Sequence, residues 1–160
     1  MPDMSKRKAS KESDERETPW ALYNIIAGKL DRPYLDVCAN EANKKCAKYY
    51  GPRSPWGADG LEKPWDVPWW CNPPYSGIEA WVKKALDAPA EGVMLVPAAP
   101  ETGWFRTAWS GALEVAFLAP RVRFLKDGKL MGSPPFGSAV FVFGPRLIEG
   151  PPRVGLLRWK

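Results

Sequence analysis

The stretch that most constrains the fold is "VPWWCNPPYSGIEAW" at residues 67–81. Its first five residues form an apolar run, which predicts a short buried strand. Pro73 and Pro74 follow, and strand pairing has to stop there because proline has a fixed φ angle and no N–H. Beyond them, Ser76 and Glu79 match the S-x-x-E capping box that starts a helix, and apolar side chains then recur at helical spacing. We therefore expect a stiff turn from a buried strand into an amphipathic helix.

The same alternation of strand and helix runs through most of the chain, and strands follow one another near its end. This order is typical of a single α/β domain with a mostly parallel sheet, covered by helices and finished by antiparallel strands. We expect strands at 33–39, 67–71, 92–98, 113–119, 122–125 and 138–143, the last two flanking the turn "KDGK". We expect helices that start at Thr18-Pro19, at Asn40 (covering 40–50), after Ser76 and at Thr102 (covering 102–109).

The first 17 residues form a charged segment with five basic and five acidic side chains. Apart from Met and Ala it has no apolar side chain, so it cannot bury a core, and we expect a disordered tail at 1–17. The remaining residues, 18–160, are enough for one domain with a core of its own.

Histidine is absent from the chain, which narrows the chemistry that it can perform. Ser-His-Asp and Cys-His catalysis are excluded, as is the H-x-E signature of the zinc deaminases. Cys38, Cys46 and Cys71 form no C-x-x-C pair, so we expect no metal site, no disulfide framework and a reducing intracellular compartment. No apolar run reaches the roughly 18 residues that span a membrane, and no signal peptide is visible. Catalysis has to rely on amides, carboxylates, aromatic rings or a cofactor.

Positive charge is concentrated near the C-terminal end. Residues 120–160 carry eight basic and two acidic side chains, whereas the whole chain has a net charge of +5. Four of the cations surround the KDGK turn, namely Arg121, Arg123, Lys126 and Lys129. Such a cluster favours a polyanionic partner and contacts with phosphates, although a solvated basic tail and a solvated turn explain the same charges.

The turn at residues 72–75 presents polar atoms that suit an amino group. Asn72 offers a side-chain oxygen and Pro73 a carbonyl, so two fixed acceptors lie close together. Tyr75 offers a flat ring for stacking. A planar base with an exocyclic amino group, such as adenine, fits all three, and in duplex DNA it would have to flip out to reach them. A glutamine amide or an RNA base also fits, and a purely structural turn stays an alternative.

Asp36 lies near the end of an earlier predicted strand, as Asn72 does for its own strand. Ligands of open α/β sheets bind at the carboxyl ends of the strands, so we expect both side chains to face one crevice. The alternative for Asp36 is a helix cap or an ion pair.

Stretches spread over roughly residues 18–143 resemble the phage-type DNA N-6-adenine methyltransferase (Dam) family of S-adenosylmethionine-dependent amino-methyltransferases, whose hallmark is NPPY. They are "TPWALYNII", "LDVCANEANKKCAKYYG", "DGLEKPW", "CNPPYSGIEAWVKKA", "VMLVPAAPETGWF", "RVRFL" and "PPFGSAVFVF". The resemblance implies a Rossmann-like methyltransferase sheet with a reversed final strand. It implies methyl transfer from S-adenosylmethionine to adenine N6 in DNA, without a metal. It also implies a phage-encoded protein that acts in the host cytoplasm and protects DNA from host restriction.

The resemblance assigns roles to individual residues as well. It implies that the target amine is handled by Asn72, Pro73, Pro74 and Tyr75, and that the cofactor pocket is lined by Thr18, Pro19, Asp36, Cys38, Ala39, Asp59, Leu61 and Asn72. The sequence departs from general methyltransferases in two ways, because "DVCAN" lacks a glycine-rich turn and no acidic residue ends a second strand. Glu41 or Asn43 is the candidate to hold the cofactor ribose. The competing functions are an NPPY enzyme acting on an RNA base or a protein amide, and a non-enzymatic basic domain that binds nucleic acid.

Overall fold

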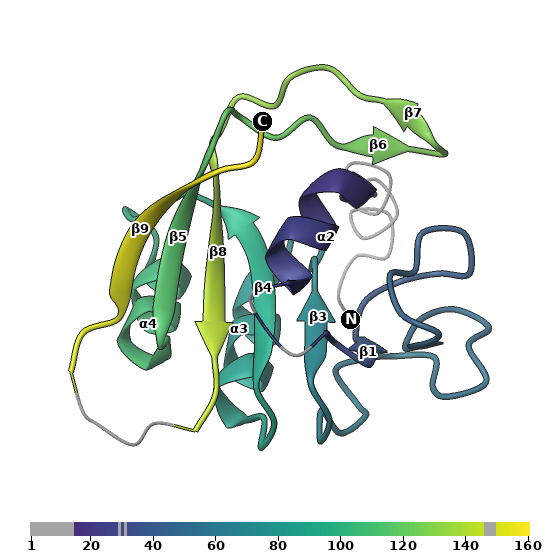
Figure 1. Cartoon of the computed structure of the whole chain (residues 1–160). Coiled ribbons are helices and arrows are strands. Elements are labelled where there is room, and N and C mark those ends of the chain that lie inside the picture. Colours follow the sequence, from purple (N-terminus) through teal and green to yellow (C-terminus); the bar gives the residue numbers. More distant parts are fainter. Residues whose placement is uncertain (1–14, 29, 31, 146–149) are drawn as a thin grey trace, which may run out of the picture.

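A seven-stranded sheet forms the centre of the computed structural model, which describes residues 15–28, 30, 32–145 and 150–160 (Figure 1). In spatial order its strands are β2 (Lys48–Tyr49), β1 (Leu35–Asp36), β3 (Trp69–Cys71), β4 (Gly92–Pro97), β8 (Ser138–Phe143), β5 (Glu114–Ala119) and β9 (Arg153–Arg158). Among the described strands of this sheet only β8 is reversed, because it is antiparallel to both of its neighbours, β4 and β5. The expected α/β domain with a mostly parallel sheet is confirmed, but the reversed strand lies inside the sheet. The strand that comes last in the chain, β9, is parallel to β5.

Helices cover both faces of the sheet. On one face lies α2 (Trp20–Ala27), whose Leu22 and Ile26 pack with Trp70 and other side chains of that face. The other face is covered by α3 (Ile78–Asp87) and α4 (Gly103–Gly111), as Figure 1 shows. Trp69 belongs to this second core, so consecutive tryptophans of β3 point to opposite faces, as strand geometry requires.

A small hairpin, β6 (Leu125–Lys126) and β7 (Lys129–Leu130), projects beside the sheet edge where β3 and β4 end (Figure 1). The KDGK turn is confirmed, with φ angles of 51° at Asp127 and 74° at Gly128. The prediction that strands 122–125 and 138–143 flank this turn is wrong. The turn joins β6 to β7, whereas residues 138–143 form β8 in the main sheet.

The predicted helix over residues 40–50 is wrong. Asn40 does behave like a cap, since its Oδ1 accepts hydrogen bonds from the backbone N–H groups of Ala42 and Asn43, both at 2.9 Å. The chain then leaves the helical path because the Lys45 N–H donates to Asp36 Oδ2 at 2.9 Å. Residues 48 and 49 become β2, parallel to β1. A long-range contact with a buried carboxylate thus overrides the local helical pattern.

Two predicted helix caps are also wrong. The N-cap of α2 is Pro19 and that of α3 is Gly77, at a left-handed φ of 69°, and neither helix has a side-chain cap bond at its start. Thr102 acts as expected, because its hydroxyl accepts the Phe105 N–H at the start of α4. The Thr18 hydroxyl instead accepts a hydrogen bond from Asn72 Nδ2.

The last residues of the predicted tail, 15–17, make contacts with the rest of the structure. The backbones of Glu17 and Leu125 exchange two hydrogen bonds, of 2.8 and 2.9 Å, so the segment before α2 is tied to the β6 strand. For residues 1–14, the predicted tail lies outside the described residues. Within the part of the chain that is described, no helix is long and apolar enough to cross a membrane.

Candidate active site

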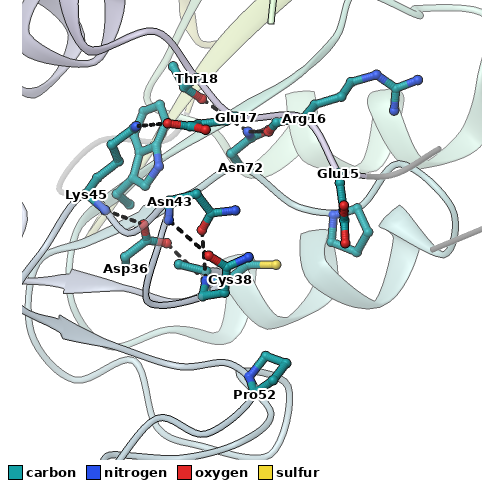
Figure 2. A pocket seen from close by; sticks show the side chains of 14 residues that line it. Glu15, Arg16, Glu17, Thr18, Asp36, Cys38, Asn43, Lys45, Pro52 and Asn72 are labelled. Atoms are coloured by element: carbon teal, nitrogen blue, oxygen red, sulfur yellow. Dashed lines mark hydrogen bonds and ion pairs between the residues drawn. The ribbon is translucent and has the colours of Figure 1, made fainter. Parts of the chain in front are cut away.

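The ends of β1 and β3 create the candidate site. The two strands are parallel and in register, with Asp36 opposite Trp70, so the segments that follow them leave the sheet side by side. Between these segments and residues 15–18 lies a pocket with a volume of about 280 Å³ (Figure 2). It is near the lower end of the range of small-molecule pockets, about 300–1,000 Å³. The expected crevice at the carboxyl ends of the strands is therefore present.

The pocket brings together Asp36, Asn72 and several other residues expected there. The predicted site residues that line it are Thr18, Asp36, Cys38, Ala39, Asn72 and Pro74. The residues that sequence reasoning missed include Arg16, Asn40, Lys45, Pro52 and Trp70. Arg16 was missed because it was assigned to the tail, and Lys45 because it was placed on a helix that does not form.

The two ends of the Asn72 side-chain amide differ in their hydrogen bonding. Its Nδ2 donates to the Arg16 carbonyl oxygen at 2.6 Å and to Thr18 Oγ1 at 3.1 Å, so both of its N–H groups are used (Figure 2). Its Oδ1 is buried and has no hydrogen-bond partner among the described residues. An unsatisfied buried acceptor costs about 1–3 kcal/mol and usually marks a place where a ligand or water belongs. The geometry therefore offers an acceptor to an incoming N–H group.

Asp36 is almost fully buried, with 2% of its surface exposed. Its carboxylate accepts the backbone N–H of Lys45 at 2.9 Å and that of Cys38 at 3.2 Å. Burial raises the pKa of Asp36 from 3.8 to about 7, although the two N–H groups and the Lys45 ammonium oppose the rise. Asp36 thus fixes the turn after β1, and its charge depends on conditions near neutral pH.

Lys45 places a buried ammonium at the same pocket. Its side chain is 2% exposed, and Nζ lies 3.9 Å from a Glu17 carboxylate oxygen and 4.2 Å from the centre of the Trp20 ring. Neither contact is a hydrogen bond, and Nζ has no hydrogen-bond partner among the described residues. Burial lowers the pKa of Lys45, while Glu17 and Asp36 oppose that fall. The pocket wall therefore carries an incompletely satisfied cation.

Tyr75 follows the proline pair but is packed more tightly than expected. Its ring makes edge contacts with Phe124 and Phe136, at 6.4 and 5.6 Å between ring centres. The Arg16 guanidinium lies over the ring, 5.0 Å from its centre. Burial raises the pKa of Tyr75, and its hydroxyl has no hydrogen-bond partner among the described residues. A ring face predicted to hold a base is covered by a cation of the chain itself.

Five residues that were predicted to handle the amine or the cofactor do not line the pocket, namely Pro19, Asp59, Leu61, Pro73 and Tyr75. Pro73 is buried beside Asn72, and Pro19 is the N-cap of α2. Asp59 is exposed, and its Oδ1 accepts the Leu61 N–H at 2.9 Å within a loop turn. Pro19, Asp59 and Leu61 thus take part in a helix start and in a loop turn.

The missing glycine-rich turn after β1 has a substitute in the following loop. A Cβ atom at Gly51 would overlap the Ala39 carbonyl oxygen, and one at Gly60 would overlap the Val37 carbonyl oxygen. Close backbone approach is a role for which glycine is required. The glycines lie on the loop that packs against the turn, so their absence from "DVCAN" does not prevent tight packing there.

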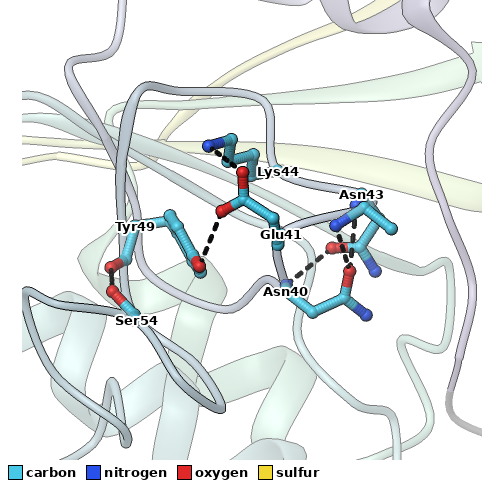
Figure 3. A network of polar contacts seen from close by, with 7 residues as sticks. Asn40, Glu41, Asn43, Lys44, Tyr49 and Ser54 are labelled. Atoms are coloured by element: carbon cyan, nitrogen blue, oxygen red, sulfur yellow. Dashed lines mark hydrogen bonds and ion pairs between the residues drawn. The ribbon is translucent and has the colours of Figure 1, made fainter.

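A polar network continues from the pocket toward β2 (Figure 3). Glu41 accepts from Lys44 Nζ and from the Tyr49 hydroxyl, both at 2.9 Å, and these bonds lower the pKa of Glu41. Asn43 Oδ1 accepts the Asn40 N–H at 2.8 Å, and Asn43 lines the pocket whereas Glu41 does not. Of the two candidates for holding a ribose, the geometry favours Asn43.

One of the basic residues around the hairpin, Lys126, lies next to this pocket. A neighbouring cavity is lined by Lys126, Asp127 and Gly128 on the hairpin side and by Asn40 and Asn43 on the other. Arg121 and Arg123 each donate to a backbone carbonyl, of Pro134 and Met131, and Lys126 lies 4.0 Å from the Glu15 carboxylate. Lys129 is exposed. Of the four cations, Lys126 is the one that lines this neighbouring cavity, and the other three line neither cavity.

Comparison with known proteins gives two matches. The family model described as DNA N-6-adenine-methyltransferase (Dam) matches residues 5–145. A protein of Escherichia phage T1, described as a DNA N-6-adenine-methyltransferase, is 32% identical over 106 residues. The match covers 63% of this chain and 43% of the phage protein, so it extends over less than half the length of that relative.

Proposed function

Because the chain belongs to the DNA N-6-adenine-methyltransferase (Dam) family, as the resemblance predicted, we propose that it transfers a methyl group from S-adenosylmethionine to N6 of adenine in DNA. The observation that carries this proposal is the side-chain amide of Asn72. Both N–H groups of its Nδ2 are hydrogen-bonded, whereas its buried Oδ1 has no hydrogen-bond partner among the described residues. An acceptor fixed in this way suits an amino group that has to be held while it is methylated.

The residues of the pocket fit a methyl donor of this class. S-adenosylmethionine, when bound, supplies an electrophilic methyl group on a positively charged sulfur, and it also carries one carboxylate and one ammonium group. The pocket offers carboxylates at Glu15, Glu17 and Asp36, a buried ammonium at Lys45, and apolar walls such as Trp70. Opposite charges are thus available for both ends of the donor's amino-acid part.

Asn72 would act on the substrate amine. The lone pair of adenine N6 is delocalised into the ring, so N6 is a weak nucleophile. Hydrogen bonds from N6–H to Asn72 Oδ1 and to the Pro73 carbonyl would favour a tetrahedral, more electron-rich nitrogen. The donor would supply the methyl group, and the two acceptors would hold the amine while N6 gives up one proton to solvent. The rigid prolines keep the acceptors in place throughout.

Arg16 and Tyr75 define where a flipped base would stack. The Arg16 guanidinium covers the Tyr75 ring at 5.0 Å, and it also lies 5.6 Å from the centre of the Phe136 ring. A target base that stacks on this face of Tyr75 would take the place of the guanidinium. Arg121, Arg123, Lys126 and Lys129 would contact the phosphates beside the flipped nucleotide.

The test is methyl transfer with labelled S-adenosylmethionine and three acceptors in parallel: duplex DNA, RNA and a mixture of proteins. We expect label in N6-methyladenine from digested DNA, and transfer that weakens as salt rises. Label found only in RNA or in protein amides would contradict the DNA activity. Donor binding, measured separately by calorimetry with S-adenosylhomocysteine, shows whether an inactive preparation is correctly folded.

A further inference from the structure

The segment before α2 holds the amide of Asn72 in a single orientation. We propose that Thr18 is a positioning residue that keeps Asn72 Oδ1 turned toward the substrate amine; this inference rests on the proposed function. Thr18 Oγ1 accepts from Asn72 Nδ2 at 3.1 Å, and the Arg16 carbonyl accepts from the same nitrogen at 2.6 Å.

The orientation matters because the two ends of an amide differ in hydrogen bonding but hardly in shape. If the Asn72 amide rotated by half a turn, Oδ1 would face the Arg16 carbonyl oxygen and two acceptors would repel each other. The nitrogen would then point to the place of the substrate amine, where two donors would meet. The Arg16 carbonyl opposes this flip, and Thr18 satisfies the second N–H, so that no buried donor is left without a partner.

Thr18 is free for this role because it does not cap a helix. Its exposed fraction is 1%, and α2 begins after Pro19 without a side-chain cap bond. Its burial and its contact with a residue 54 positions away are unusual for a threonine next to a helix start. The sequence pattern predicts a cap, but the hydroxyl is directed to the catalytic turn instead.

The chain is held in place on both the N-terminal and the C-terminal side of Thr18. Toward the C-terminus it is followed directly by Pro19 and α2, which packs on the sheet. Toward the N-terminus, Glu17 exchanges two backbone hydrogen bonds with Leu125 of β6. The acceptors that hold Asn72 are therefore fixed to two elements at once, and they are not carried by a free chain end.

Two substitutions separate positioning from other roles of Thr18. Thr18→Val keeps the shape of the side chain but removes the acceptor, whereas Thr18→Ser keeps the hydroxyl. We expect Thr18→Val to lower the single-turnover rate of methyl transfer by about 10- to 100-fold, because a misplaced acceptor no longer meets the amine. We expect Thr18→Ser to recover most of the rate. In an Asn72→Ala background, Thr18→Val should cause no further loss.

The affinity for S-adenosylhomocysteine distinguishes positioning from direct contact with the donor. We expect Thr18→Val to leave this affinity within about twofold, since the hydroxyl is used by Asn72. A parallel loss of affinity and rate would overturn the proposal, because it would place the hydroxyl on the donor. Equal rates for Thr18→Val and the unchanged chain would overturn it too.

A measurement without turnover keeps this inference separate from the proposed function. The side-chain amide protons of Asn72 are assigned in NMR spectra by their disappearance in Asn72→Ala. We expect both protons to exchange slowly with water in the unchanged chain, and one of them to exchange faster in Thr18→Val but not in Thr18→Ser. Fast exchange of both protons in the unchanged chain would refute the positioning contact. Slow exchange without any DNA methylation would refute the function and leave the contact standing.

Discussion

The pKa of Asp36 makes the stability of this protein depend on pH in an unusual direction. A carboxylate in an ion pair normally has a lowered pKa and stabilises the folded state as pH rises. Here burial raises the pKa of Asp36 from 3.8 to about 7, so the folded state holds this proton more tightly than the unfolded chain does. The Asp36 contribution is therefore fully present below about pH 4 and is lost as pH rises through about 7.

The size of the effect follows from the two pKa values. A tenfold change in proton affinity corresponds to about 1.4 kcal/mol, so the step from 3.8 to about 7 amounts to at most about 4 kcal/mol of unfolding free energy. Other carboxylates titrate over the same range, and a matched variant is needed to separate them. Asp36→Asn keeps one acceptor and the shape but does not titrate.

The assay is urea unfolding of the unchanged chain and of Asp36→Asn between pH 4.5 and pH 7.5. We expect the difference in unfolding free energy between the two proteins to move in favour of Asp36→Asn as pH rises, by about 1 kcal/mol per pH unit or slightly more. At low pH, Asp36→Asn should be the less stable protein, because its amide nitrogen faces the Lys45 N–H, which donates to Asp36 Oδ2. Parallel curves over the whole pH range would refute the reasoning.

Three further predictions test the site and its surroundings. Asn72→Ala should reduce methyl transfer by about 100- to 1,000-fold while the affinity for S-adenosylhomocysteine stays within about twofold; retained transfer would show that the acceptor lies elsewhere. In chemical unfolding, Gly51→Ala should lower the unfolding free energy by more than about 2 kcal/mol, because the new methyl group overlaps the Ala39 carbonyl oxygen. The control is Gly103→Ala, whose new methyl group has no described atom within 4 Å, and it should change the unfolding free energy by less than about 1 kcal/mol. Lys129→Gln should reduce the slope of log affinity for DNA against log salt by about 1, and an unchanged slope would remove this cation from the phosphate contacts.

Much of the fold could be predicted because the elements with regular patterns are also the buried ones. The sequence shows apolar runs at β3, β4, β5 and β8 and a periodic apolar face at α3, and these side chains are buried in the structure. The wrong secondary-structure predictions concern segments whose backbone path is set by a contact with a residue far away in the sequence. Asp36 takes the N–H of Lys45 and ends a helical pattern before it can form. Most of β9 is exposed, so it carries no run of buried residues that would mark it as a strand.

The site was predictable to the same extent. Asn72 and Asp36 could be named because the proline pair and the strand ends are local features. Arg16 could not be named because its contacts with Asn72 and Tyr75 join positions 56 and 59 apart, and its charged neighbours suggest a tail. Lys45 has no local signal either, since a lysine in a polar stretch normally lies at the surface. Arg16 and Lys45 could be found only by asking which groups form hydrogen bonds with the buried amide of Asn72 and the buried carboxylate of Asp36.

The turn at residues 72–75 has a structural role, and the chemical role that we propose for it depends on the same rigidity. Proline fixes the backbone but cannot orient a side chain, so rigidity of the chain alone leaves the Asn72 amide free to rotate. The second constraint comes from Arg16 and Thr18, which hold the nitrogen and leave the buried oxygen without a partner in the described part of the chain. A site of this kind is built from a stiff local turn and a distant segment together, and changing either part should disturb the same acceptor.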